Sequence, residues 1–480
     1  MNRRMVLYTI GTVIKIEAAL MLLPAICALI YKEACLSAFA VSIAICLISG
    51  FALTLISRPG NKVIYARDGF VTVALAWIAL SAFGALPFYI SGEIPSYIDA
   101  FFETVSGFTT TGSSILADVE AMSKGLLFWR SFTHWVGGMG VLVFIMAIIP
   151  SLSDRSIHLL RAEAPGPIVG KLVPTMKKTS RILYIIYFVL TVILILLLLA
   201  GGMAPFEAIV HAFGTAGTGG FGIKADSIAS YSPYLQWVIT VFMLLFGVNF
   251  NIFYLILLGK LRSAFRSTEL WVYLGIVAAS TALITVNILP LTESFSQSLR
   301  EAAFQVSSII TTTGYATADF DKWPGLSKTV LLTLMFIGAC AGSTGGGIKV
   351  SRIVILAKAV RRELKKLLHP RSVSVLRFEG KRLEEQTVSS VASYLSVYIF
   401  FFVAVLLALS FENQSFETNF SAAAACFNNI GPGLAAVGPT QNFALYSPVS
   451  KLVLSVAMLF GRLEIYPLFI ALSPSTWTKK

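Results

Sequence analysis

The sequence Thr312-Thr313-Gly314-Tyr315-Ala316 follows an apolar segment, Gln297 to Ile310, that is shorter than the ~20 residues a helix needs to cross a bilayer. Three more short apolar segments also end in a polar run with a central glycine. We call the four polar stretches glycine runs 1 to 4, in chain order, with Thr312 to Ala316 as run 3. The other pairs are Ser96 to Thr109 with Thr110-Thr111-Gly112-Ser113-Ser114, Pro205 to Ala216 with Gly217-Thr218-Gly219-Gly220-Phe221, and Phe416 to Cys426 with Asn429-Ile430-Gly431-Pro432-Gly433.

The repeat extends beyond the glycines. An acidic residue stands 12 to 14 residues before each central glycine, and the next apolar span carries a glycine 24 to 30 residues after it. We expect each acid to lie in the first turn of a short helix, where the helix macrodipole favours negative charge. The acids are Asp99, Glu207, Glu301 and Glu417, and the downstream glycines are Gly138, Gly247, Gly338 and Gly461.

The composition indicates a membrane protein. Of the 480 residues, 56% are hydrophobic and 13% are charged, against about 25% charged residues in an average soluble protein. The mean hydropathy is +0.80. Charged residues within the first apolar span, Lys15 and Glu17, are interpreted as side chains that snorkel to the membrane surface. We expect ten full spans near residues 6–31, 36–57, 70–91, 128–150, 181–202, 234–259, 269–290, 327–348, 387–410 and 446–470.

The predicted fold is therefore an all-α integral membrane protein. Four repeats of span, short pore helix, glycine run and span are expected in a pseudo-fourfold arrangement around one pore. The expected parts are an N-terminal transmembrane hairpin (1–57), repeat 1 (58–180), repeat 2 (181–266), repeat 3 (267–386) with an intramembrane loop at 340–349, and repeat 4 (387–480).

Basic residues are concentrated on one side of the predicted membrane. Ten spans place both termini on the same side, and that side carries 27 of the 37 Lys and Arg residues. The positive-inside rule therefore places both termini in the cytoplasm and accounts for the net charge of +13. Basic runs such as Arg361 to Lys366 are interpreted as contacts to anionic lipids or a partner protein, in preference to nucleic acid.

The glycine runs predict an ion pathway. Non-helical backbone at membrane depth is tolerated only where protein buries it or where it lines water, so the four runs should converge on one aqueous axis. Glycine adopts positive φ freely, which lets successive carbonyl oxygens replace the hydration shell of an ion. Run 3 closely resembles the Thr-Val-Gly-Tyr-Gly filter of potassium channels. The candidate ion-binding residues are Thr110, Thr111, Gly112, Ser113, Gly217, Thr218, Gly219, Gly220, Thr312, Thr313, Gly314, Tyr315, Asn429, Ile430, Gly431 and Pro432.

Longer motifs resemble the Trk/Ktr/HKT superfamily over nearly the whole chain, and the additional N-terminal hairpin resembles the TrkH/TrkG branch. The resemblance implies potassium uptake across the cytoplasmic membrane. Members with serine at the first filter glycine often favour sodium, whereas Gly112, Gly219, Gly314 and Gly431 are all present here. The motifs are Phe128 to Ser131, His134 to Gly140, Arg161 to Pro167, Gly338 to Lys349, and Gly461 to Glu464.

The eighth predicted span contains a glycine-rich break, since each glycine in a helix costs about 1 kcal/mol relative to alanine. The family resemblance implies that this segment is a mobile gating loop below the filter. A phosphate-binding loop is a poor alternative, because Ile348-Lys349-Val350 follows Gly347 where that motif needs Gly-Lys-Ser/Thr. The gate residues are Gly342, Ser343, Thr344, Gly345, Gly346, Gly347 and Lys349.

Arg462 lies within the last predicted span, where a charge usually faces protein or a water-filled cavity. By resemblance it would lie under the filter and act as a barrier to cations. A structural ion pair with Glu464 or another acid is the open alternative.

The resemblance further implies a homodimer that docks a cytosolic ring of nucleotide-binding regulatory subunits of the TrkA type. The basic segments 151–181 and 349–386 are the candidate docking sites. No covalently bound cofactor is expected, potassium is the only expected metal, and nucleotide would act only through the separate subunit. Two alternatives remain from the residues alone: an alternating-access secondary transporter, and an enzyme built on Glu103, His134 and His211, for which no nucleophile motif is present.

Overall fold

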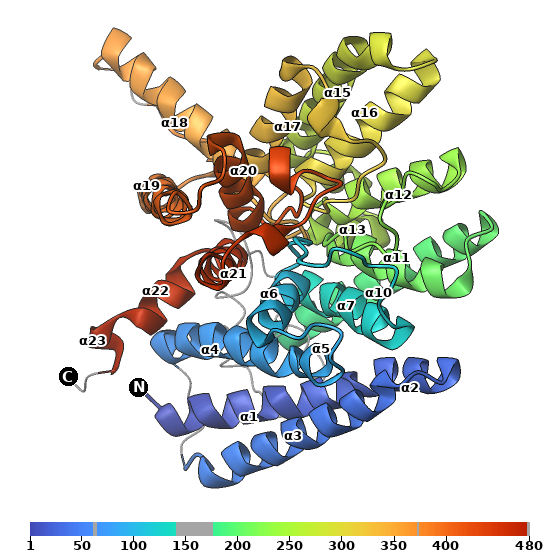
Figure 1. Cartoon of the computed structure of the whole chain (residues 1–480). Helices are drawn as coiled ribbons and strands as arrows, with labels where there is room; N and C mark the ends of the chain where they lie inside the picture. The colour runs from blue at the N-terminus through green and yellow to red at the C-terminus, as the bar shows by residue number, and fades with distance from the viewer. Residues whose placement is uncertain (61–64, 141–175, 372–373, 478–480) are drawn as a thin grey trace.

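The computed structural model describes residues 1–60, 65–140, 176–371 and 374–477. The Arg161 to Pro167 motif and most of the basic segment 151–181 lie outside these residues. The described chain is helical apart from one small hairpin, β1 (Arg377–Phe378) with β2 (Lys381–Arg382). Figure 1 shows the short helices α6, α11, α16 and α20 around a common centre, with α1 to α3 to one side.

The helices follow the predicted order of the repeats. The N-terminal hairpin holds α1 (Arg3–Leu20), α2 (Leu22–Tyr31) and α3 (Cys35–Ile56). Repeat 1 holds α4 (Ala66–Gly84), α5 (Leu86–Ile90), α6 (Tyr97–Phe108) and α7 (Lys124–Gly138). Repeat 2 holds α10 (Met176–Ala200), α11 (Pro205–Gly217), α12 (Pro233–Phe246), α13 (Phe250–Leu257) and α14 (Leu261–Ala264).

The second half of the chain repeats this order. Repeat 3 holds α15 (Thr268–Ile288), α16 (Phe295–Ile310), α17 (Gly325–Ile337) and α18 (Val350–Leu368). Repeat 4 holds α19 (Glu385–Leu409), α20 (Phe416–Phe427), α21 (Pro448–Arg462), α22 (Tyr466–Leu472) and α23 (Pro474–Trp477). Short 3₁₀ turns cover Leu289–Leu291, Phe320–Lys322, Ala435–Val437 and Phe443–Leu445.

The four short helices confirm the predicted repeat. Three of them begin at a serine whose side chain accepts a backbone N–H of the first turn, as at Ser96, Ser294 and Ser415, and α11 begins with a proline. The first turns of α6, α11 and α20 contain the expected acid. The same expectation for Glu301 is wrong, because α16 begins earlier, at Phe295, which moves Glu301 into the second turn.

Helix packing closes the fourfold arrangement. The helix that follows each glycine run packs against the short helix of the next repeat: α7 on α11, α12 on α16, α17 on α20, and α21 on α6. Repeats 4 and 1, which are far apart in sequence, are also joined by an ion pair of 2.7 Å between Lys451 Nζ and Asp99 Oδ1. The predicted pseudo-fourfold fold is therefore confirmed.

Besides the eighth span, where a break is expected, the spans expected near residues 234–259 and 446–470 are also interrupted, and this was not predicted. Among the described residues, six helices are long and apolar enough to cross a membrane, and a seventh span is the pair α12 and α13, which is bent by 91°. The helices after runs 2, 3 and 4 break: α12 ends at Phe246, α17 at Ile337 and α21 at Arg462. After run 1, α7 ends at Gly138, and most of the remainder of that predicted span lies outside the described residues. Hydrophobicity continues beyond these breaks, which is why a sequence window joins the pieces.

The downstream glycines allow close packing at these breaks. A Cβ on Gly138 would lie 2.7 Å from the Cα of Gly217, and one on Gly247 would lie 2.7 Å from Cγ2 of Thr311. A Cβ on Gly461 would overlap the carbonyl oxygen of Phe427. In repeats 1, 2 and 4 the break therefore abuts the end of a short helix.

The interpretation of Glu17 as a snorkelling side chain is wrong. Glu17 belongs to α1 and is fully buried, and neither of its carboxylate oxygens has a hydrogen-bond partner among the described residues. Lys15 is partly buried, donates a hydrogen bond to Thr54 Oγ1 at 3.2 Å and lies over the ring of Phe51.

Candidate ion pathway

The four glycine runs share one backbone turn. In each run a residue with positive φ, between 52° and 58°, is followed two positions later by a glycine with φ between 74° and 105°. The residue between them donates its N–H to the carbonyl five positions earlier, over 2.8 to 2.9 Å. The turns are Thr110-Thr111-Gly112, Thr218-Gly219-Gly220, Thr312-Thr313-Gly314 and Asn429-Ile430-Gly431.

This turn changes the register of run 2. The sequence alignment placed Gly219 opposite Gly112, Gly314 and Gly431. The glycine with positive φ at that position of the turn is Gly220, with φ +74°, and Gly219 corresponds to Thr111. The alignment through Gly219 is therefore wrong by one residue.

Each positive-φ glycine faces the backbone of the next run. A Cβ on Gly112 would overlap the carbonyl oxygen of Gly219, one on Gly220 would overlap that of Thr313, and one on Gly314 would overlap that of Ile430. A Cβ on Gly431 would lie 2.9 Å from the carbonyl oxygen of Thr111, which returns to run 1. The four runs therefore form a closed ring in the order 1, 2, 3, 4, although run 4 lies more than 300 residues from run 1.

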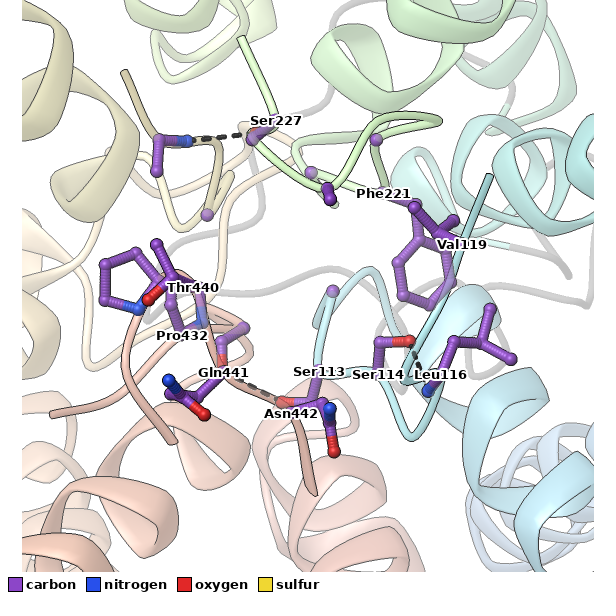
Figure 2. A pocket seen from close by; sticks show the side chains of 18 of the residues that line it. Ser113, Ser114, Leu116, Val119, Phe221, Ser227, Pro432, Thr440, Gln441 and Asn442 are labelled. Carbon is purple, nitrogen blue, oxygen red and sulfur yellow. Dashed lines mark hydrogen bonds between the residues drawn. The ribbon is translucent and has the colours of Figure 1, made fainter. Parts of the chain in front are cut away.

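A cavity of about 150 Å³ lies at the mouth of this ring. Residues of all four glycine runs line it, together with Arg130 and the 437–443 segment. Figure 2 shows side chains of repeats 1, 2 and 4 around the cavity: Asn442 lies next to Ser113, while Ser114 and Pro432 lie on opposite sides. The ring is thus open to solvent at this end.

On the opposite side of the ring lies the glycine-rich loop, residues 338–349, which separates α17 from α18. Its Gly346 donates an N–H to Thr312 Oγ1 at 2.6 Å, and a Cβ on Gly346 would overlap the carbonyl oxygen of Asn428. Lys349 donates its ammonium group to the carbonyl of Gly345 within the loop. The predicted break in the eighth span is present, and it lies directly against runs 3 and 4.

Arg462 joins this loop to repeat 1. Its guanidinium donates to the carbonyl oxygen of Thr344 at 2.8 Å and to those of Gly137 and Gly138 at 2.6 Å each. Glu464, the partner proposed in the alternative interpretation, pairs instead with Arg352 at 2.6 Å. Arg462 therefore occupies the inner side of the ring and contacts two different repeats.

Residues 36–273 and 265–479 match the family model described as TrkH, cation transport protein. The chain belongs to the TrkH family. It is 36% identical over 484 residues to the Trk system potassium uptake protein TrkH of Salmonella typhimurium, covering 99% of this chain and 100% of the relative. It is 34% identical to the Trk system potassium uptake protein TrkG of Escherichia coli K12, covering 99% of this chain and 98% of the relative.

This chain is also similar to a solved structure of a TrkH protein. The crystal structure of the potassium transporter TrkH from Vibrio parahaemolyticus superposes with a TM-score of 0.90 at 34% identity, covering 100% of both chains. The TrkH family is one of cation transport proteins, and the apolar helices make this member a multi-pass membrane protein.

In this TrkH-family chain, a buried ion pair supports the ring from behind. Glu103 Oε1 lies 2.6 Å from Arg130 Nε, and both side chains are at most 5% exposed. Glu103 also accepts hydrogen bonds from the hydroxyl of Ser114 and from the N–H of Ile115, each at 3.0 Å. Arg130 donates to the carbonyl of Gly222 at 2.9 Å and stacks over the ring of Phe221. The pair therefore connects the ends of runs 1 and 2.

The two histidines of the enzyme alternative also support the ring. His134 Nδ1 donates to the carbonyl of Gly107 at 2.7 Å, and its Nε2 accepts the N–H of Phe221 at 3.3 Å. His211 lies against the hydroxyls of Tyr315 and Tyr231, at 3.4 and 3.1 Å. Both histidines were named in the enzyme alternative, but no sequence pattern indicated these partners.

Proposed function

We propose that this protein takes up potassium across the cytoplasmic membrane through a channel-like path along the axis of the glycine ring. The closed ring of four glycine runs carries the proposal. Carbonyl oxygens at the ends of four short helices can replace the hydration shell of a potassium ion, and the negative ends of the helix dipoles favour a cation there. The named activity of the TrkH and TrkG relatives, potassium uptake, supports this assignment.

We propose that the sixteen candidate residues of the four runs bind potassium in transit and that the glycine-rich loop is the gate. The loop lies against the inner side of runs 3 and 4, and in this proposal it closes the axis. Arg462 adds a positive charge on the same side, which raises the barrier for a cation. Opening then requires the loop to move away from Thr312 and Arg462.

We also propose the assembly that the family resemblance implies. Both termini face the cytoplasm, the protein acts as a homodimer, and a cytosolic ring of nucleotide-binding subunits controls the gate. The basic helix α18 and the β1–β2 hairpin supply the docking surface on that side, and anionic lipids contact the adjacent basic residues.

The test is cation uptake by purified protein in proteoliposomes with potassium, rubidium or sodium as the permeant ion. We expect Gly112→Ser to relax discrimination against sodium, because its Cβ would displace the carbonyl of Gly219 from the ring. Gly275→Ser is the matched control, since a Cβ at Gly275 meets nothing within 4 Å. Unchanged selectivity in Gly112→Ser would contradict the assignment of the ring as the filter.

A further inference from the structure

A buried carboxylate outside the ring holds both ends of the glycine-rich loop. Glu269 is the second residue of α15 and only 4% exposed. Its Oε1 accepts the N–H of Ala341 at 2.7 Å and the N–H of Ser351 at 3.0 Å. These two donors flank Gly342 to Val350, so one oxygen atom closes the base of the segment that lies under the ring.

A second carboxylate fixes the position of Glu269 from the protein surface. Glu379, in the turn of the β1–β2 hairpin, accepts the N–H of Glu269 at 3.0 Å and the hydroxyl of Ser267 at 3.1 Å. A carboxylate at a helix N-terminus satisfies free N–H groups and interacts favourably with the helix dipole. The exposed hairpin, the start of α15 and the loop are therefore joined in one chain of hydrogen bonds.

Space is available beside this chain of contacts. A cavity of about 530 Å³ borders Glu269, Ala341, Ser351 and Glu379. The cavity leaves unfilled space between the start of the loop and the hairpin.

We propose that Glu269 is a positioning residue for the gate: it latches the glycine-rich loop against the ring, and movement of the β1–β2 hairpin releases the latch through Glu379. The proposal rests on the proposed function only in taking the loop as the gate. A cytoplasmic partner that pulls on the hairpin would then act on the loop without reaching the ion path.

The test uses Cys340, a fully buried thiol at the start of the loop, as a reporter. The full chain retains Cys340 while the four other cysteines are replaced by alanine, and labelling by a soluble maleimide is measured in detergent alongside potassium flux in proteoliposomes. The variants are Glu269→Ala, Glu269→Gln and Glu379→Ala. Glu363→Ala, an exposed site on α18, is the control.

We expect Glu269→Ala to raise the labelling rate of Cys340 and the partner-free flux about tenfold or more, because hydrogen bonds to a charged group are lost. Glu269→Gln retains an acceptor oxygen and should remain close to the parent, and Glu379→Ala should give a smaller rise. A merely structural role of Glu269 would lower the melting temperature of Glu269→Ala without raising the labelling rate of Cys340 or the partner-free flux.

Unchanged Cys340 labelling in Glu269→Ala overturns the latch. If that variant does not fold, unchanged labelling in Glu379→Ala overturns it equally, since this residue is exposed. Faster labelling with unchanged flux would support the latch and contradict the loop's role as the gate, so the two proposals fail separately.

Discussion

The two sides of the glycine ring are built on different principles. On the outer side, four copies of one turn meet backbone to backbone, and each positive-φ glycine touches a carbonyl of the next run. On the inner side, the 338–349 loop belongs to repeat 3 alone, and side chains such as Thr312, Arg462 and Glu269 hold it. Repeats 2 and 4 have only a bend or a short break at the corresponding position.

Under the proposed function, this difference separates ion selection from gating. A backbone contact cannot be exchanged by rotating a side chain, so the ring is suited to a fixed coordination geometry. A loop held by side-chain hydrogen bonds can exchange partners and adopt a second position. Under the proposed function, the symmetric ring binds the ion and the asymmetric loop of repeat 3 regulates its passage.

The largest expected effect comes from breaking the ring itself. Gly314→Ala places a Cβ on the carbonyl of Ile430 and forces an L-residue to φ +87°, which alone costs roughly 1–2 kcal/mol. We expect potassium flux to fall at least about tenfold. Gly275→Ala should leave flux unchanged, and a Gly314→Ala protein with normal flux and selectivity would show that the ring does not need this contact.

The next effect tests the support behind the ring. Glu103→Gln leaves the Arg130 charge buried without its partner, which should lower the free energy of unfolding by about 3–5 kcal/mol and weaken discrimination against sodium. Thermal unfolding in detergent and ion competition measure the two results. Lys322→Gln removes a cation whose side chain is 83% exposed, so it should change the melting temperature and the ion selectivity very little. Equal melting temperatures for the two variants would contradict the role of the buried pair.

The smallest expected effect concerns the inner side. Arg462→Ala removes both a positive charge and the hydrogen bond to Thr344, so we expect partner-free potassium flux to rise severalfold. Arg462→Lys keeps the positive charge but lacks the planar guanidinium that donates to three carbonyls. We expect this variant to retain most of the barrier to potassium flux. If the partner-free potassium flux of Arg462→Lys equals that of Arg462→Ala, the hydrogen bonds matter more than the charge. Arg266→Ala, at an exposed site, is the control.

The local parts of this architecture could be predicted from the sequence. The short helices were found within two residues of their observed ends, because helix caps, apolar length and terminal glycines are local features. Run 2 was misaligned because two adjacent glycines, Gly219 and Gly220, both fit the pattern. The distance from the preceding acid distinguishes the two glycines. Gly220 lies 13 residues after Glu207, as Gly112 does after Asp99 and Gly314 does after Glu301.

The long-range parts could not be predicted in the same way. The breaks after α12 and α21 are hidden in the sequence by apolar residues on both sides, although each has a glycine near it. Glu269 lies more than 70 residues from Ala341, and its role depends on a tertiary contact that no local pattern reports. Arg462 was recognised as costly in a membrane, yet three of its partners are backbone carbonyls, which every residue carries.

The central claim is that peptide oxygens of the four glycine runs hold the permeant ion. A structure determined by X-ray diffraction from crystals soaked in rubidium, with anomalous differences recorded, tests this most directly. We predict anomalous peaks on the ring axis, next to the carbonyls of Thr111, Gly219, Thr313 and Ile430. Rubidium found only away from these four carbonyls, with an empty ring, would contradict the account.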